Sequence, residues 1–150
     1  MSTYSFLDIV AAIDGPGGSV NLGAGAGAAE EGITIESVND KSSMITGADG
    51  SGMHSLRADN AKSVTVRLLK TSPVNALLMN MYNYQTMSSA THGKNTISVR
   101  DIARGDAITL EQVAFKRPPN LEFQVEGGIN EWQFDAIDST TVLGVGTPEI

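Results

Sequence analysis

The chain contains no cysteine, few aromatic residues and no long apolar run. Without cysteine, disulfides and thiolate metal sites are excluded. Aromatic residues make up 5% of the 150 positions while glycine occupies 16, a balance that favours a turn-rich β protein over a helical bundle. No apolar stretch approaches the ~20 residues of a membrane-spanning helix, and the start MSTYSFLDIV is not typical of a signal peptide. We therefore expect a soluble protein, made in the cytoplasm, that does not insert into membranes.

Basic residues are also scarce. Lysine and arginine total 10 against 17 aspartates and glutamates, which gives a formal net charge of −7. This sign argues against a nucleic-acid-binding surface, because phosphate neutralisation needs clustered cations. It is compatible with a surface past which a polyanion slides, since such a surface should repel it weakly. The length and the 41% apolar content suit a single domain, residues 1–150, with one core.

The centre of the chain predicts a strand followed by one short helix. Apolar side chains alternate over residues 64–68, as on one face of a strand. Ser72 is placed to cap a helix and Pro73 suits its first position, so the helix is predicted over about residues 73–85. A helix this short is not stable alone in water, so its apolar stripe must pack on a sheet or a neighbouring subunit. The stripe consists of Val74, Leu77, Leu78 and Met81.

Most of the remaining chain predicts short β-strands between turns rich in glycine and proline. These strands are residues 6–13, 20–22, 33–36, 97–102, 107–115, 121–125 and 131–137. Their lengths and spacing favour a β-barrel or sandwich. The first two should form a hairpin around Gly-Pro-Gly-Gly. The last two alternate apolar with polar side chains, so one face is core and the other is wet or faces a polar channel.

Three segments carry few signals of regular structure. Residues 23–32 alternate glycine with alanine and are expected either to be flexible or to pack closely against another segment. Residues 39–60 are rich in turn formers, and so long an irregular loop is generally functional, disordered or ordered by a partner. Residues 143–150 are expected to form an arm rather than a core element.

Catalytic, cofactor and metal motifs are weak. The glycine repeat of residues 23–28 fits a dinucleotide fingerprint only nominally, because a strand rather than a helix follows it. Ser51 precedes His54 in a glycine-rich loop, but the glycine spacing is wrong for a nucleophile elbow. His54 and His92 lie in separate predicted loops, and the carboxylates lack the spacing of a calcium loop. The sequence therefore predicts no enzyme activity, no cofactor and no local metal motif.

Five segments that cover nearly the whole chain closely resemble a family of phage structural proteins, the tail tube proteins. They are FLDIVAAIDGPGGSVNLGAGAGAAEEGITIE, GADGSGMHS, VRLLKTSPVNALLMNMYNYQ, NTISVRDIARGDAITLEQVAFKRPPNLEF and NEWQFDAIDSTTVLG. The resemblance implies the fold shared by phage tail tubes and the type VI secretion tube protein, a β-barrel or sandwich with one flanking helix. It names no catalytic residues. It also implies hexameric rings that stack into a hollow tube for genome delivery.

The same resemblance implies a location and partners. We expect the protein in the virion, after assembly in the host cytoplasm, and we favour a contractile tail in which a sheath surrounds the tube. The implied partners are further copies of the chain and the tail sheath, baseplate, terminator and tape-measure proteins. DNA is expected to pass through without specific binding.

A tube that conducts DNA needs a polar lumen, where carboxylates repel phosphates over a Debye length of about 8 Å. Polar side chains opposite apolar partners on the predicted strands are candidates for this lining, although they could instead face outer solvent or a sheath. The lumen candidates are Glu111, Glu122, Gln124, Glu126, Gln133 and Asp135.

We also expect residues 39–60 and the C-terminal arm to become ordered when rings stack, because they hold too little apolar content for their own domain to fix them. The candidates for this stacking role in the loop are Ser42, Met44, Asp49, Met53, His54 and Arg57.

Other functional classes stay open at this point. A terminator or baseplate subunit with the same fold would give single rings that never stack. A monomeric binding module of the sandwich type would stay compact at high concentration and carry a defined pocket. An enzyme would need titratable groups that converge in such a pocket, which the sequence does not indicate.

Overall fold

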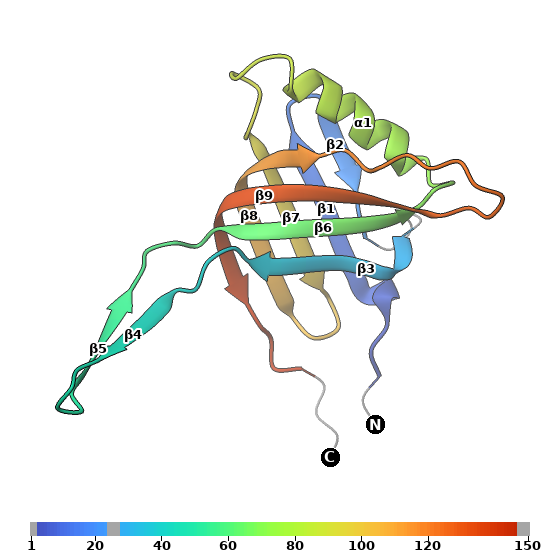
Figure 1. Cartoon of the computed structure of the whole chain (residues 1–150). Helices are drawn as coiled ribbons and strands as arrows, with labels where there is room; N and C mark the ends of the chain where they lie inside the picture. The colour runs from blue at the N-terminus through green and yellow to red at the C-terminus, as the bar shows by residue number, and fades with distance from the viewer. Residues whose placement is uncertain (1–2, 24–27, 147–150) are drawn as a thin grey trace.

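The computed structural model describes residues 3–23 and 28–146 and is mainly β, with one α-helix. Its seven-stranded antiparallel sheet has the order β2-β1-β7-β8-β9-β6-β3, and it curves strongly, with α1 at one end of the curve (Figure 1). A separate hairpin, β4-β5, projects from the body. The elements are η1 (Phe6–Asp8), β1 (Ile9–Gly15), β2 (Gly18–Asn21), β3 (Ala28–Ser37), β4 (Ser42–Thr46), β5 (Gly52–Leu56), β6 (Lys62–Leu69), α1 (Val74–Gln85), β7 (Asn95–Asp101), β8 (Asp106–Arg117) and β9 (Ile129–Val142).

The N-terminal hairpin forms as predicted, with Gly15 opposite Gly18 across the turn. The strand expected from residue 6 begins only at Ile9, because residues 6–8 make a short 3₁₀ turn. Ser5 stabilises that turn, since its Oγ accepts a hydrogen bond from the Leu7 amide over 3.1 Å. The expectation for the glycine–alanine tract concerns residues that mostly lie outside the described part of the chain.

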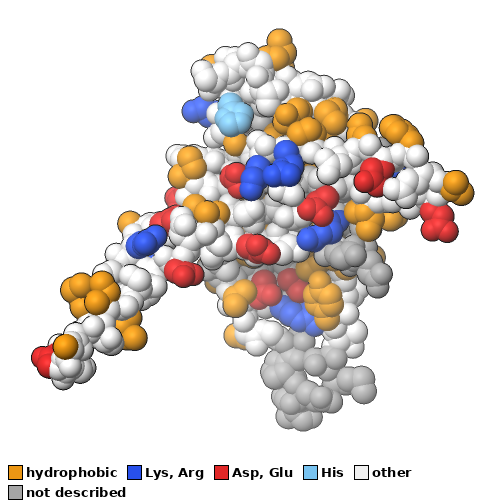
Figure 2. All heavy atoms as spheres, viewed as in Figure 1, with side chains coloured by type: hydrophobic (Ala, Val, Ile, Leu, Met, Phe, Trp, Pro, Cys, Tyr) orange, Lys and Arg blue, Asp and Glu red, His pale blue; other side chains and the backbone are white. Residues whose placement is uncertain are grey.

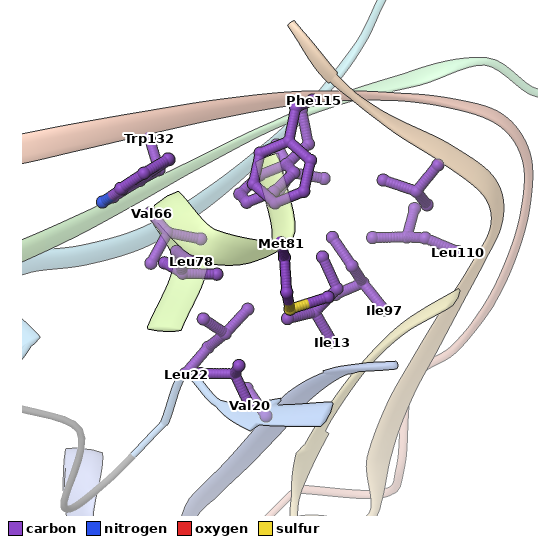
Figure 3. Packing of buried hydrophobic residues seen from close by; sticks show 14 of the residues in the cluster. Ile13, Val20, Leu22, Val66, Leu78, Met81, Ile97, Leu110, Phe115 and Trp132 are labelled. Carbon is purple, nitrogen blue, oxygen red and sulfur yellow. The ribbon is translucent and has the colours of Figure 1, made fainter. Parts of the chain in front are cut away.

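The core lies inside the curved sheet and beneath the helix. Phe115 is its aromatic centre, with ring centroids 4.8 Å from Phe134, 6.0 Å from Trp132 and 5.7 Å from Tyr82. Figure 3 shows side chains from the strands and from α1 converging on this space. The buried apolar residues are Ala11, Ile13, Val20, Leu22, Val64, Val66, Leu68, Val74, Leu78, Met81, Ile97, Leu110, Val113, Phe115, Trp132, Phe134 and Ala136.

The helix begins where the sequence predicts, although only part of the expected stripe is buried. Ser72 Oγ accepts a hydrogen bond from the Val74 amide over 3.3 Å. Val74, Leu78 and Met81 are buried, whereas Leu77 is 50% exposed and does not pack on the sheet of its own subunit. The buried positions follow one narrow line along the helix, and Leu77 lies about 100° around the axis from Leu78.

Buried polar side chains attach both ends of the helix to the sheet. Near the start of α1, Asn75 Oδ1 accepts a hydrogen bond from Trp132 Nε1 over 3.0 Å. At the end, Gln85 Nε2 donates to Pro16 O over 2.8 Å and to Asn95 Oδ1 over 2.7 Å, while Asn95 Nδ2 donates back to Gln85 Oε1 over 2.6 Å. Because both amides are satisfied, this contact fixes the helix without leaving an orphaned polar group.

Two predictions of secondary structure are wrong, namely an irregular segment over residues 39–60 and a strand over residues 121–125. Residues 39–60 contain the strands β4 and β5, which pair with each other and not with the main sheet. They lack an apolar alternation because all their residues are exposed. Residues 121–125, expected to be a strand, belong instead to the irregular connection between β8 and β9, where none of their backbone groups joins a strand ladder.

A β-bulge interrupts the pairing of β7 with β8. Ile97 lies opposite Leu110 and Asn95 opposite Val113, so β8 has one residue more than β7 across this interval. Gln112 has a φ of 54°, which is rare for a residue other than glycine. Leu110 and Val113 can therefore both point into the core, although they are three positions apart.

Candidate assembly surfaces

A polar hollow lies at the end of the sheet where β8 leads into β9. The loop residues Glu122, Gln124 and Glu126 line it together with Glu131 and Gln133 of β9. Gln124 Nε2 donates to Glu122 Oε2 over 2.6 Å, and Gln133 Nε2 donates to Glu131 Oε1 over 3.1 Å. The cations that line the same hollow are Lys70 and Arg117. Five of the six expected lumen residues are thus neighbours of this hollow or lie on the strand face that continues from it.

Asp135 continues the polar face along β9. It is exposed, alternates with the buried Phe134 and Ala136, and lies opposite Ser63 of β6. Glu111 does not belong to the same group, because it lies opposite Asp138 immediately before the bulge in β8. Gln133 and Asp135 share one face of β9, so Asp135 extends the polar surface that begins at the hollow. Glu111 lies apart from this surface.

The loop also has an apolar side, which the sequence wrongly placed in the core. Leu121, Phe123 and Val125 are 58%, 86% and 106% exposed. Lys70 Nζ lies 4.2 Å from the centroid of the Phe123 ring and also donates to the Glu122 carbonyl oxygen. Alternate residues of this loop therefore divide between a polar hollow and an uncovered apolar surface.

The β4-β5 hairpin carries all six stacking candidates on or beside its strands. Met44 lies opposite His54 and Ile45 opposite Met53, so each of the two faces holds apolar side chains. Ser42 begins β4, Asp49 lies in the turn, and Arg57 follows β5. Figure 2 shows hydrophobic side chains along this projecting hairpin. No residue of β4 or β5 is buried against the body.

Hydrogen bonds order the root and the turn of the hairpin. At the root, Asp59 accepts from the Ala61 amide over 2.8 Å and from Asn39 Nδ2 over 2.6 Å, and these bonds hold the pKa of Asp59 below its usual value. In the turn, the Ser51 hydroxyl donates to Asp49 Oδ1 over 2.6 Å, which lowers the pKa of Asp49. Ser51 is thus part of a turn, and its hydroxyl bonds to a carboxylate rather than to His54.

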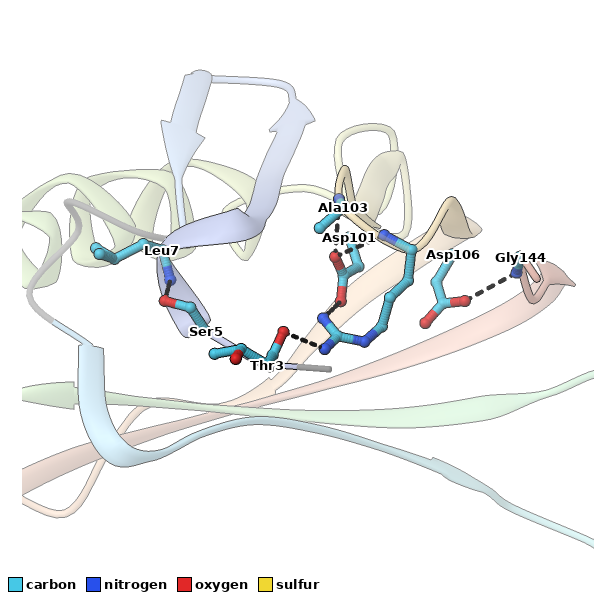
Figure 4. Close-up of polar contacts among 8 residues, drawn as sticks. Thr3, Ser5, Leu7, Asp101, Ala103, Asp106 and Gly144 are labelled. Atoms are coloured by element: carbon cyan, nitrogen blue, oxygen red, sulfur yellow. Dashed lines mark hydrogen bonds and ion pairs between the residues drawn. The ribbon is translucent and has the colours of Figure 1, made fainter. Parts of the chain in front are cut away.

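The turn between β7 and β8 holds segments from both ends of the chain (Figure 4). Arg104 forms an ion pair with Asp101 at 3.3 Å and donates to the Thr3 carbonyl oxygen over 2.6 Å. Asp106 accepts a hydrogen bond from the Gly144 amide over 2.9 Å. The first part of the C-terminal arm is therefore attached to the body, although Leu143 and Val145 are 72% and 96% exposed.

No group of histidine, cysteine, aspartate and glutamate suited to a metal ion occurs within residues 3–23 and 28–146. Over the same residues, α1 is neither long nor apolar enough to span a bilayer.

Comparisons with known proteins agree with this description. The family model of the bacteriophage PhiTE tail tube protein matches residues 1–144. None of the curated proteins matches the sequence. Among solved structures, one similar protein is the sheath/tube terminator of the PVC extracellular contractile injection system in its extended state. Its TM-score is 0.61 at 9% identity, and the match covers 95% of this chain and 98% of that one. At such identity the likeness establishes the fold alone.

Two further structures are similar to a comparable extent. The tube-terminating cap of the anti-feeding prophage has a TM-score of 0.56 at 10% identity, covering 96% of this chain and 93% of that one. A chain of the PVC sheath-tube complex in the extended state has a TM-score of 0.59 at 7% identity. The match covers 94% of this chain and 92% of that one. The fold is therefore that of tube and cap proteins of contractile injection systems.

The matched family consists of structural tail proteins and is not an enzyme class. Its members are components of a virion or a phage-like particle. Because the family model covers nearly the full length, the chain belongs to the bacteriophage PhiTE tail tube protein family.

Proposed function

We propose that this chain is the subunit of a hollow tail tube, in which hexameric rings stack and conduct the genome into the host through a contractile tail. The polar outer face of the sheet carries this proposal. On β9, Gln133 and Asp135 face outward while Trp132, Phe134 and Ala136 face the core, and Thr65 and Ser63 lie opposite them on β6. This face would line the bore, together with Glu122, Gln124 and Glu126.

The charge of this face suits a polyanion in transit. Arg67 is paired with Glu131 at 3.7 Å, and the polar hollow holds three carboxylates against two cations. A phosphate passing within a Debye length of about 8 Å therefore meets no cluster of uncompensated cations there. Weak repulsion of this kind keeps DNA from binding to the wall.

A barrel built from part of each subunit's sheet would have a bore of suitable width. If about four strands from each of about six subunits closed one inner barrel at a spacing of ~4.8 Å, its backbone circumference would be roughly 115 Å and its diameter ~37 Å. Double-stranded DNA fits through such an opening. Closure would also cover the outer edge of β3, which has no strand partner beyond β6 in the described sheet.

The hairpin and the C-terminal arm are assigned to contacts between stacked rings. Both segments carry apolar side chains that the body does not cover. Met53 of the hairpin is 59% exposed, and Val145 of the arm is 96% exposed. Hydrogen exchange of the isolated subunit and of the assembled tube tests this role. Amides of residues 42–59 should be more protected in the tube, and equal protection in both states would exclude the hairpin from stacking.

The remaining proposed partners are the tail sheath on the outer wall and the baseplate, terminator and tape-measure proteins at the tube ends and in its lumen. Electron microscopy of the purified chain at rising concentration tests the central proposal. We expect tubes with a constant bore, whereas a chain that stays monomeric at every concentration would refute the proposal.

A tube terminator is the second candidate, because two of the similar structures are terminating components of contractile injection systems. The same micrographs separate the two functions. A terminator forms single rings that do not stack, and it binds the end of a tube made from another protein.

A further inference from the structure

The turn between β7 and β8, residues 101–106, contacts one segment from near each end of the chain, on two sides of the turn (Figure 4). Arg104 donates to the Thr3 carbonyl oxygen over 2.6 Å, and its Cζ lies 5.1 Å from the centroid of the Tyr4 ring. Asp106 accepts a hydrogen bond from the Gly144 amide over 2.9 Å. One short turn therefore holds an N-terminal and a C-terminal segment at the same time.

A single carboxylate orders this turn. Asp101 Oδ1 accepts hydrogen bonds from the amides of Ala103 and Arg104 over 3.1 and 3.3 Å, and its Oδ2 pairs with the Arg104 guanidinium at 3.3 Å. The Asp101 side chain is only 6% exposed. Gly105 has a φ of 80°, and its amide donates to the Asp101 carbonyl oxygen over 2.8 Å. Asp101 thus fixes both the turn backbone and the guanidinium that contacts Thr3.

The C-terminal segment packs directly on the backbone of the same turn. A Cβ added at Gly144 would collide with the Arg104 carbonyl oxygen and lie 2.9 Å from the Gly105 carbonyl carbon. Only glycine permits so close an approach. The Arg104 backbone therefore forms part of the surface that Gly144 contacts, while the Arg104 side chain contacts Thr3.

These two contacts share the cost of ordering the turn. Each residue that is fixed in one conformation loses entropy, and this loss opposes folding of the turn. A second segment that packs on a turn already ordered by the first does not incur that loss again. Such a coupling is reciprocal, so each segment should stabilise the other to the same extent.

We propose that the β7–β8 turn is a clasp that couples the order of the two chain ends, so that release of residues 3–8 loosens residues 143–146, and the reverse. Arg104 is the shared residue of the clasp. A molecule that binds one end of the chain would thereby change the accessibility of the other end. The coupling acts within one subunit and so goes beyond the proposed tube.

Amide hydrogen exchange, followed by NMR on the full chain at concentrations where it is monomeric, gives one reporter for each end. The Ile102 amide donates to the Asp8 carbonyl oxygen over 3.1 Å and reports on the N-terminal segment. The Gly144 amide donates to Asp106 and reports on the C-terminal segment.

Arg104→Gln removes the ion pair with Asp101 and the guanidinium contact with Thr3. It should speed exchange at both reporters by at least about tenfold, because hydrogen bonds to charged groups contribute enough for such a factor. Arg100→Gln is the matched control, since it removes an exposed arginine of β7 that lies outside the clasp, and it should change neither rate. Unchanged exchange of the Gly144 amide in Arg104→Gln would overturn the coupling.

Gly144→Ala tests the reverse direction and carries the test alone if Arg104→Gln does not fold. Position 144 lies beyond the end of β9 at Val142, so the sheet should stay intact. Exchange of the Ile102 amide should be at least about fivefold faster, the lower end of typical coupling between sites. Gly127→Ala is the control, because an added Cβ there meets nothing within 4 Å. An unchanged Ile102 rate in Gly144→Ala refutes the clasp.

Two further measurements separate coupling from general destabilisation. In the variant that combines Arg104→Gln with Gly144→Ala, the Ile102 rate should rise by less than the product of the two single effects, whereas independent effects would multiply and contradict the clasp. Amides next to the paired Val66 and Trp132 should keep their wild-type rates. Equal acceleration there would mean global loosening and would also overturn the inference. All of these results leave the proposed tube untouched, because they concern the monomer.

Discussion

Replacing Leu78 with alanine should destabilise the subunit far more than the same replacement at Leu77. Leu78 is 0% exposed beneath the helix, whereas its neighbour is 50% exposed. Buried leucine-to-alanine changes cost about 2–5 kcal/mol, because transfer free energy is lost and a cavity remains. We expect about 3 kcal/mol for Leu78→Ala and less than about 1 kcal/mol for Leu77→Ala. The two variants lose the same helix-forming residue type, so helix propensity cancels in the comparison.

The single tryptophan supplies the assay. Trp132 is buried and its indole N–H donates to Asn75 at the start of the helix, so its fluorescence reports on helix docking. Urea unfolding should be measured at concentrations where the chain is monomeric. A loss of about 3 kcal/mol corresponds to a fall in Tm of about 6–12 °C for a chain of this length. Equal losses in the two variants, or a loss below about 1 kcal/mol for Leu78→Ala, would refute the described packing of α1.

Three further predictions follow from individual contacts. Gln85→Leu removes both hydrogen bonds between Gln85 and the buried Asn95, which then keeps only its bond to the Val113 carbonyl oxygen, and should cost about 2–4 kcal/mol in urea unfolding; a neutral result would contradict the buried amide pair. Because the pKa of Asp59 is lowered, its hydrogen bonds at the hairpin root should persist as the pH falls through the usual aspartate range. They should be lost only at the lower pKa of the folded state. An NMR titration of the Ala61 amide with a midpoint at or above the usual aspartate value would disprove this. Asp135→Lys should leave tube formation unchanged but make tubes retain double-stranded DNA at low salt, and tubes that bind no more DNA than wild type would show that this side chain does not line the bore.

The sequence predicts the helix well because its signals are local. Ser72 and Pro73 mark the start, and the apolar repeat marks the buried face. The pattern does not indicate that Leu77 stays exposed within its own subunit, since spacing alone does not reveal how wide a stripe the sheet covers. It also misses Gln85, a fully buried amide, because only the folded chain brings Asn95 to it.

The errors in the β regions have one physical cause. Alternation of apolar and polar residues shows that two sides of an extended segment face different surroundings, but not that a strand partner exists within the same molecule. Residues 121–125 alternate without pairing, and the strands β4 and β5 pair without alternating because neither face is buried. The grouping of Glu122, Gln124 and Glu126 with Gln133 emerges only from the way the loop folds back on β9.

The bulge at Gln112 has a mechanical consequence. A slip of β8 by a single position would turn Leu110, Val113 and Phe115 out of the core, and the extra residue in β8 fits opposite β7 at one place only. Sliding of these strands past each other is therefore blocked within a subunit. If the chain forms the proposed tube, an axial load should therefore separate neighbouring subunits before any subunit shears internally.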